Sequence, residues 1–180
     1  MNSFLEALQA SGPAPERGAK MDLYGWLIGS WDLEVSEFPP QQAPRRRSGE
    51  WHFGWALEGR AIQDVWIVPK RGPDRGLGRD GDPVARNFRY GTTLRIYDPQ
   101  LDAWHIQWSE PIHQVHWRMI GRAEGGDIVQ LGELPDGTKT RWSFREIKKD
   151  SFLWRGELQF PGKSGWYTNI EFRARRVGAA

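Results

Sequence analysis

The segment SGEWHFGWALEGRAIQDVWIVP (residues 48–69) decides the fold. Trp51, Phe53 and Trp55 occupy alternate positions, and alternate side chains of a β-strand share one face. Glu58-Gly59 then interrupts the run as a hairpin turn does, and a second strand-like run follows it. The segment predicts an antiparallel hairpin with one aromatic face.

The same alternation recurs along the chain between turn sequences such as Asp98-Pro99 and Gly125-Gly126. We expect strands at residues 30–38, 48–58, 60–69, 89–97, 103–110, 114–124, 127–134, 138–147, 151–160 and 165–176. Short connections favour pairing of consecutive strands, and closure removes exposed sheet edges. The sequence therefore predicts an all-β protein, an antiparallel up-and-down β-barrel of about ten strands.

The N-terminal residues differ from the rest of the chain. Ser3 and Glu6 have the spacing of a capping box, and residues 22–28 could form one or two helical turns. We therefore expect one or two short N-terminal helices, with residues 1–20 as helix and linker and residues 21–180 as a single barrel domain. The sequence leaves open whether the first helix docks on a partner, for example in a homodimer, or caps the barrel mouth.

Composition limits the partners and the compartment. The 180 residues carry a net charge of +2 and no cysteine. A weak net charge disfavours nucleic acid as the main partner, and the absence of cysteine rules out a disulfide framework. No apolar run is long enough for a membrane helix, and the first residues lack the features of a signal peptide. We expect a cytoplasmic protein without a membrane or nucleic-acid partner.

One short motif suggests a relationship. Gly29-Ser30-Trp31 resembles the Gly-x-Trp signature of the calycin superfamily, which includes lipocalins, fatty-acid-binding proteins and nitrobindins. The overall pattern is similar to that of uncharacterised bacterial lipocalin-like proteins. The resemblance implies a helical turn before the first strand and a tryptophan at the closed end of the barrel. It also implies an arginine of the last strand over that tryptophan, here Arg173, Arg175 or Arg176, and a small, largely apolar ligand.

Cofactors and metals find little support in the sequence. Nitrobindins bind haem through a histidine on a late strand, whereas the last histidine here is His116. His105, His113 and His116 cluster around one hairpin, but no acidic residue completes a zinc site. The G-x-G-x-x-G match at residues 76–81 is followed by Pro83 and lacks the βαβ context of a dinucleotide site. We expect no cofactor and no metal.

The turns also predict which residues pair. The Glu58-Gly59 turn sets Trp55 opposite Ile62, Phe53 opposite Asp64 and Trp51 opposite Trp66. The next hairpin sets Tyr97 opposite Trp104, Arg95 beside Ile106 and Thr93 beside Trp108. If the tryptophans point inward, four polar side chains come with them: Arg60, Asp64, Arg95 and Tyr97.

Charged groups inside a barrel need a reason, because burial of an unpaired charge is costly. Asp64 could form an internal ion pair with Arg60 or Arg95, or one guanidinium could bind an anionic or carbonyl-bearing ligand. Arg141 and Arg145 pose a related question. A connection at residues 148–151 would set Arg145 beside Trp154, but the favoured interpretation places both arginines outside.

Three functions remain open. The first is binding of a small hydrophobic or aromatic molecule, with an anionic group as an option, inside the barrel. The candidate ligand-binding residues are Arg60, Asp64, Trp66, Arg95, Tyr97, Trp55, Trp108 and Trp154. The second is a cofactor-independent isomerase, cyclase, hydratase or lyase with Asp64 as the proton-transfer group. The third is a structural or interaction barrel with a solid core. The favoured interpretation of the long irregular stretch at residues 69–88 is a flexible excursion at the barrel rim, and a lid or binding loop is the alternative.

Overall fold

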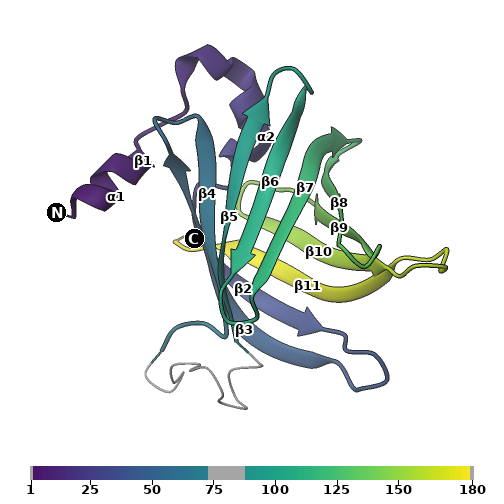
Figure 1. Ribbon diagram of the computed structural model, residues 1–180. Helices are drawn as coiled ribbons and strands as arrows, with labels where there is room; N and C mark the ends of the chain where they lie inside the picture. Colours follow the sequence, from purple (N-terminus) through teal and green to yellow (C-terminus); the bar gives the residue numbers. More distant parts are fainter. Residues whose placement is uncertain (1, 73–87, 179–180) are drawn as a thin grey trace.

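The structure is a computed structural model that describes residues 2–72 and 88–178. Ten antiparallel strands, β2 to β11, form a closed barrel (Figure 1). The strands are β2 (Gly29–Glu37), β3 (Arg45–Ala56), β4 (Ala61–Val68), β5 (Arg89–Asp98), β6 (Ala103–Glu110), β7 (Val115–Glu124), β8 (Asp127–Glu133), β9 (Lys139–Arg145), β10 (Ser151–Gln159) and β11 (Tyr167–Arg176). The predicted fold class is confirmed.

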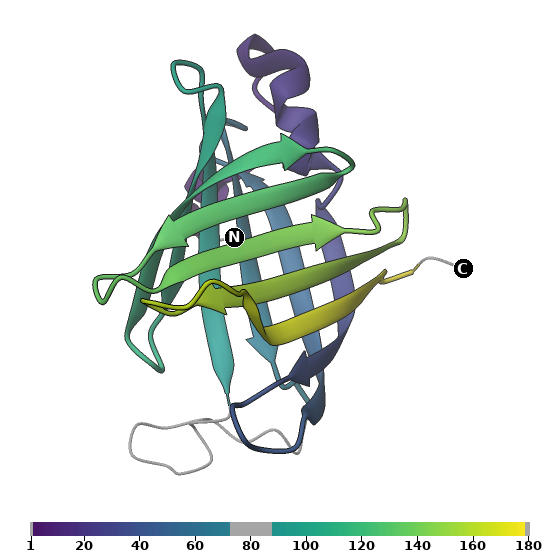
Figure 2. The same cartoon turned by 90° about the vertical axis from the view of Figure 1, so that its right-hand side faces the viewer.

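Each strand pairs with the next one along the chain, and β11 pairs with β2 to complete the ring. Figure 2 shows β8 to β11 crossing in front of the remaining strands, so the sheet wraps around an interior. Closure of this kind leaves no long unpaired edge. Among the described helices, none has the length and apolar character needed to cross a membrane.

The predicted pairings of the two tryptophan-rich hairpins are confirmed. Trp51 pairs with Trp66 and Phe53 with Asp64 across β3 and β4. Tyr97 pairs with Trp104 across β5 and β6, and the remaining predicted pairs of both hairpins also occur. The tryptophan face points into the barrel, because Trp51, Trp66 and Trp104 are all buried.

The turns themselves differ from the predicted ones in two places. The β3–β4 pairing ends at Ala56 and Ala61, so the turn has four residues, 57–60, in place of the predicted two. Between β9 and β10, Arg145 pairs with Leu153, not with Trp154. Glu146 adopts a positive φ of 49° there, and the connection shifts the register by one residue. Phe144 therefore meets Trp154 inside, and the favoured exterior placement of Arg145 is confirmed.

The N-terminal segment lies against one end of the barrel. Helix α1 (Ser3–Leu8) is capped by the side chain of Asn2, not by the expected capping box of Ser3. The two-residue strand β1 (Gln9–Ala10) pairs with Trp55 and Ala56 at the end of β3. A 3-10 helix, η1 (Pro15–Met21), runs through most of the expected linker and leads into helix α2 (Asp22–Gly25).

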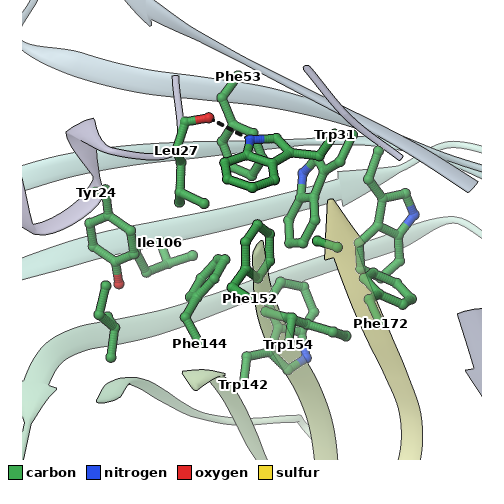
Figure 3. Close-up of a cluster of buried hydrophobic side chains, with 14 of the residues drawn as sticks. Tyr24, Leu27, Trp31, Phe53, Ile106, Trp142, Phe144, Phe152, Trp154 and Phe172 are labelled. Carbon is green, nitrogen blue, oxygen red and sulfur yellow. Dashed lines mark hydrogen bonds between the residues drawn. The ribbon is translucent and has the colours of Figure 1, made fainter. Parts of the chain in front are cut away.

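Helix α2 and its neighbours close this end of the barrel. Trp31 at the start of β2 is fully buried, and its indole N–H donates a 2.7 Å hydrogen bond to the carbonyl of Leu27 (Figure 3). The guanidinium of Arg176 lies 4.1 Å from the centroid of the Trp31 ring and donates hydrogen bonds to the carbonyls of Trp26 and Ile28. The expected arginine cover over the tryptophan is thus present, and Arg176 supplies it.

Candidate functional site

The opposite end of the barrel contains a cavity. β2 and β6 end there, at Glu37 and Glu110, while β3, β5 and β7 begin there. Within residues 2–72 and 88–178, no element plugs this end as α2 plugs the other. We refer to this space as the mouth cavity.

The mouth cavity has a volume of about 450 Å³. Its walls are mostly aromatic and aliphatic, with five tryptophans deeper inside and a few polar side chains nearer the rim. The lining residues are Glu37, Phe38, Pro39, Pro40, Arg45, Trp66, Arg89, Trp108, Glu110, His113, Val115, Trp117, Trp142, Trp154, Leu158, Phe160, Tyr167, Asn169 and Ile170. A cavity of this composition suits a molecule with a flat apolar body.

The five tryptophans contact one another and form a single aromatic wall. The ring centroids of Trp66 and Trp108 are 4.4 Å apart, and those of Trp142 and Trp154 are 5.2 Å apart. Trp117 reaches the same group through Trp142, at 5.9 Å. These tilted and edge-to-face contacts hold each ring in place, so the wall is preformed and would lose little entropy when a ligand binds.

The rim carries a hydrogen-bonded row of three side chains. Glu110 is buried, and its carboxylate accepts hydrogen bonds from the backbone N–H groups of Ile112 (2.7 Å) and His113 (3.0 Å). The same carboxylate contacts Nδ1 of the His113 imidazole. On the other side of the ring, Nε2 of His113 lies 3.2 Å from Nη1 of Arg89.

These contacts assign the tautomer of His113. An ionised carboxylate only accepts hydrogen bonds, so Nδ1 carries the proton that Glu110 receives. A guanidinium only donates, so Nε2 presents its lone pair toward Arg89. The contacts thus place the Nδ1–H of the imidazole on Glu110 and the lone pair of Nε2 on the side of Arg89.

Only part of the predicted ligand-binding set lines the mouth cavity. Trp66, Trp108 and Trp154 do. Asp64 and Arg95 point inward as predicted, but they do not line this cavity. They form an ion pair with each other in which both side chains are completely buried. Of the two interpretations offered for the inward charges, the structure shows the internal ion pair, with Arg95 as the partner of Asp64.

The surroundings of this pair explain why it is inaccessible. The Arg95 guanidinium lies 5.4 Å from the ring centroids of both Tyr24 and Phe53, and Phe144 packs close by. Burial raises the pKa of Asp64, while Arg95 and the backbone N–H of Thr93 oppose that change. The pair lies among packed side chains and does not line the mouth cavity.

The other three predicted residues lie at or near the closed end. Arg60 does not face inward, because the wider turn places it on the surface, where it pairs with Glu16 and Glu58. The hydroxyl of Tyr97 donates a 2.6 Å hydrogen bond to Asp102 outside the mouth cavity. Trp55 is partly buried next to Gly25 of α2. The inward placement of Arg60 was wrong because the prediction assumed a two-residue turn.

Sequence reasoning missed several lining residues. Trp117 and Trp142 alternate within predicted strands, so the signal that found the other tryptophans applied equally to them. Glu110 and His113 gave a weaker signal, a turn of the form Glu-Pro-Ile-His. The contact between their side chains depends on the conformation of the β6–β7 turn, which places the Glu110 carboxylate next to the His113 imidazole.

The remaining histidines of the cluster point elsewhere. His105 is on the outer face and contacts Asp98 at 2.9 Å, while the ring of His116 contacts Ser109 at 3.2 Å. Within residues 2–72 and 88–178, no three His, Cys, Asp or Glu side chains gather as a metal site would require. The glycine-rich match at residues 76–81 and most of the expected loop at 69–88 lie outside the described residues.

Comparison with solved structures identifies the architecture. The crystal structure of Rv2717c from M. tuberculosis matches with a TM-score of 0.58 at 14% identity, covering 91% of this chain and 98% of that chain. The S-type phycobiliprotein lyase CPES from Guillardia theta matches with a TM-score of 0.57 at 10% identity, covering 93% and 100%. These likenesses show the fold alone, a closed antiparallel β-barrel. No protein-family model and no curated protein matches the chain.

Proposed function

We propose that the protein binds a small, largely apolar molecule with an aromatic body in the mouth cavity. The observation that carries this proposal is a preformed wall of five tryptophans around about 450 Å³ of space. Pockets for small molecules span roughly 300–1,000 Å³ and are lined mainly by apolar and aromatic side chains. A core that served stability alone would bring these rings together without leaving such a space.

The polar side chains of the rim indicate that the ligand also carries a polar group. Arg45 and Arg89 supply hydrogen-bond donors and positive charge, and Glu37 and Glu110 supply negative charge. Glu110 is already satisfied by His113 and two backbone N–H groups, so it offers little to a ligand. The balance favours a ligand that carries a carbonyl or carboxylate oxygen at the end nearer to the mouth.

Two alternatives are weaker. A solid structural barrel does not account for the cavity. An enzyme that uses Asp64 does not account for the complete burial of that residue behind Arg95. The fold itself is compatible with catalysis, because the S-type phycobiliprotein lyase CPES has a barrel of the same fold.

Titration with 2-naphthoate, followed by tryptophan fluorescence, tests the proposal. We expect saturable quenching, because the probe would lie against the tryptophan wall. Val115→Trp should weaken the affinity at least tenfold, since Val115 lines the cavity and a larger side chain would fill it. Val177→Trp is the matched control, because Val177 is more than half exposed outside the barrel.

The two variants make the outcome decisive. Loss of binding in Val115→Trp alone supports the mouth cavity. Equal binding by both variants, or quenching that never saturates in the wild-type protein, contradicts the proposal. Both variants gain one tryptophan, so the number of fluorophores is matched between them.

A further inference from the structure

The row Glu110–His113–Arg89 exceeds what binding of an apolar molecule requires. A buried carboxylate that holds an imidazole at Nδ1 fixes the ring and favours the form in which Nε2 is basic. All three side chains line the mouth cavity. The arrangement therefore places a base, a group that orients it and a cationic donor at the edge of an apolar space.

We propose that this row makes the mouth cavity a proton-transfer site for a small carbonyl compound that has an acidic C–H next to its carbonyl. His113 is the base, Arg89 binds the carbonyl oxygen, and Glu110 is a positioning residue. The inference rests on the proposed function, because the substrate must first occupy the cavity.

The distances show how the two active groups could share one substrate. Nη1 of Arg89 lies 3.2 Å from Nε2 of His113 and 3.0 Å from the carbonyl of Phe88. A substrate oxygen that accepts a hydrogen bond from Nη1 of Arg89 would lie close to Nε2 of His113. The carbon next to that carbonyl would then be adjacent to the base. Arg89 would also stabilise the negative charge that develops on the oxygen.

The chemical step balances without a metal, an oxidant or a cofactor. The C–H bond breaks, its proton forms an N–H bond at Nε2, and its electron pair moves to the carbonyl oxygen to give an enolate. Return of the proton to carbon restores the ketone, and its delivery to oxygen gives the enol. In D2O the imidazolium exchanges its proton with solvent, so the substrate carbon acquires deuterium.

The row is better suited to this chemistry than Asp64, the only acid predicted from the sequence to act in proton transfer. Asp64 is fully buried in an ion pair, whereas the His113 side chain is 29% exposed. The remaining charged residues that line the cavity, Glu37 and Arg45, belong to the ends of β2 and β3. In the ring of strands, β4 alone separates β3 from β5, which carries Arg89.

Phenylpyruvate in D2O provides the test, because its benzylic C–H lies next to a carbonyl and its ring suits the tryptophan wall. Deuterium incorporation is followed by proton NMR, and binding of the same compound is followed by tryptophan fluorescence. We expect the protein to accelerate exchange at least tenfold over buffer. His113→Gln should reduce that catalysed rate by roughly 100-fold or more, as removal of a general base does, with binding retained.

His116→Gln is the matched control. His116 belongs to the same hairpin, but it does not line the cavity, so the variant should exchange as fast as the wild-type protein. Binding of phenylpyruvate without exchange overturns the proposal and leaves the proposed function intact. So does equal exchange by His113→Gln and wild type. Failure of phenylpyruvate to bind while 2-naphthoate binds also overturns the proposal, whereas failure of both contradicts the proposed function.

The positioning role of Glu110 has its own readout. Glu110→Gln should change the nitrogen chemical shifts of the His113 ring, since the carboxylate that holds the proton on Nδ1 is lost. The same variant should slow exchange less than His113→Gln does. Unchanged ring shifts in Glu110→Gln would show that the carboxylate does not orient the imidazole.

Discussion

At the scale of single residues, the ion pair of Asp64 and Arg95 carries the largest energetic consequence. Both side chains are completely buried among aromatic rings. Nε and Nη2 of Arg95 have no hydrogen-bond partner within the described part of the chain, so Asp64 supplies most of its compensation. Removing one partner from such a pair leaves an uncompensated charge in the core.

Asp64→Asn should therefore lower the free energy of unfolding by about 3–5 kcal/mol, as loss of one partner of a buried pair does. The double variant Asp64→Leu/Arg95→Met, which removes both charges at similar volume, should lose less stability than the single variant. Urea unfolding of the three proteins measures the differences. A single variant as stable as wild type would contradict the assignment of a buried charge pair.

A second residue-scale prediction concerns Glu50 on the outside of β3. Burial opposes its ionisation, but hydrogen bonds from Arg71 and His52 outweigh that effect and lower the pKa of Glu50 to about 2. A carboxyl whose folded-state pKa is lowered stabilises the fold above its ordinary pKa of about 4.3. This stabilisation is lost as the pH falls from there toward 2.

Glu50→Gln should therefore be less stable than wild type near neutral pH, by about 2 kcal/mol once the exposure of Arg71 is discounted, and the gap should narrow at about pH 3. Urea midpoints at the two pH values measure this change. Glu124→Gln, at the exposed end of β7, is the control and should show no such gap. A difference in stability between wild type and Glu50→Gln that widens in acid would contradict the lowered pKa of Glu50.

At the scale of elements, alternation and turn type predicted more of the strand pairing than of the turns. The Trp51–Trp66 register was correct although the turn was two residues longer than expected, because the extra residues extend the turn symmetrically. The β9–β10 register was wrong, because the positive φ of Glu146 has no sequence signal as strong as glycine. Apolar alternation kept the correct face inward in the β3–β4 hairpin, whereas for β9 either face stayed possible and the favoured exterior placement of Arg145 was correct.

Arg176 joins three elements at the closed end, and it provides the element-scale prediction. It covers Trp31 and donates to the carbonyls of Trp26 and Ile28 that follow α2. Arg176→Ala should lower the free energy of unfolding by about 2 kcal/mol, because the variant loses the hydrogen bonds of a charged donor and a cation–π contact. Arg175 is exposed, one position earlier in β11. Arg175→Ala should lower the free energy of unfolding by less than about 0.5 kcal/mol, measured in the same way. Equal costs would contradict the role of Arg176.

At the scale of the whole molecule, the barrel was predictable, but the division of its interior was not. Alternation reports which face of a strand points inward, yet it does not report depth along the barrel axis. Arg95 and Trp108 share the inner face of neighbouring strands, but one lies in the packed half and the other lines the mouth cavity. Depth follows from strand tilt and from which end α2 closes, and both need the assembled fold.

The most direct test of the binding site is NMR of the indole N–H groups of the eleven tryptophans during titration with 2-naphthoate. Each tryptophan side chain contributes one such signal, and substitution to phenylalanine assigns it. We predict shifts for Trp66, Trp108, Trp117, Trp142 and Trp154, with Trp31 and Trp104 at the closed end unchanged. Shifts confined to the closed end or to Trp166 on the outer surface would contradict binding in the mouth cavity.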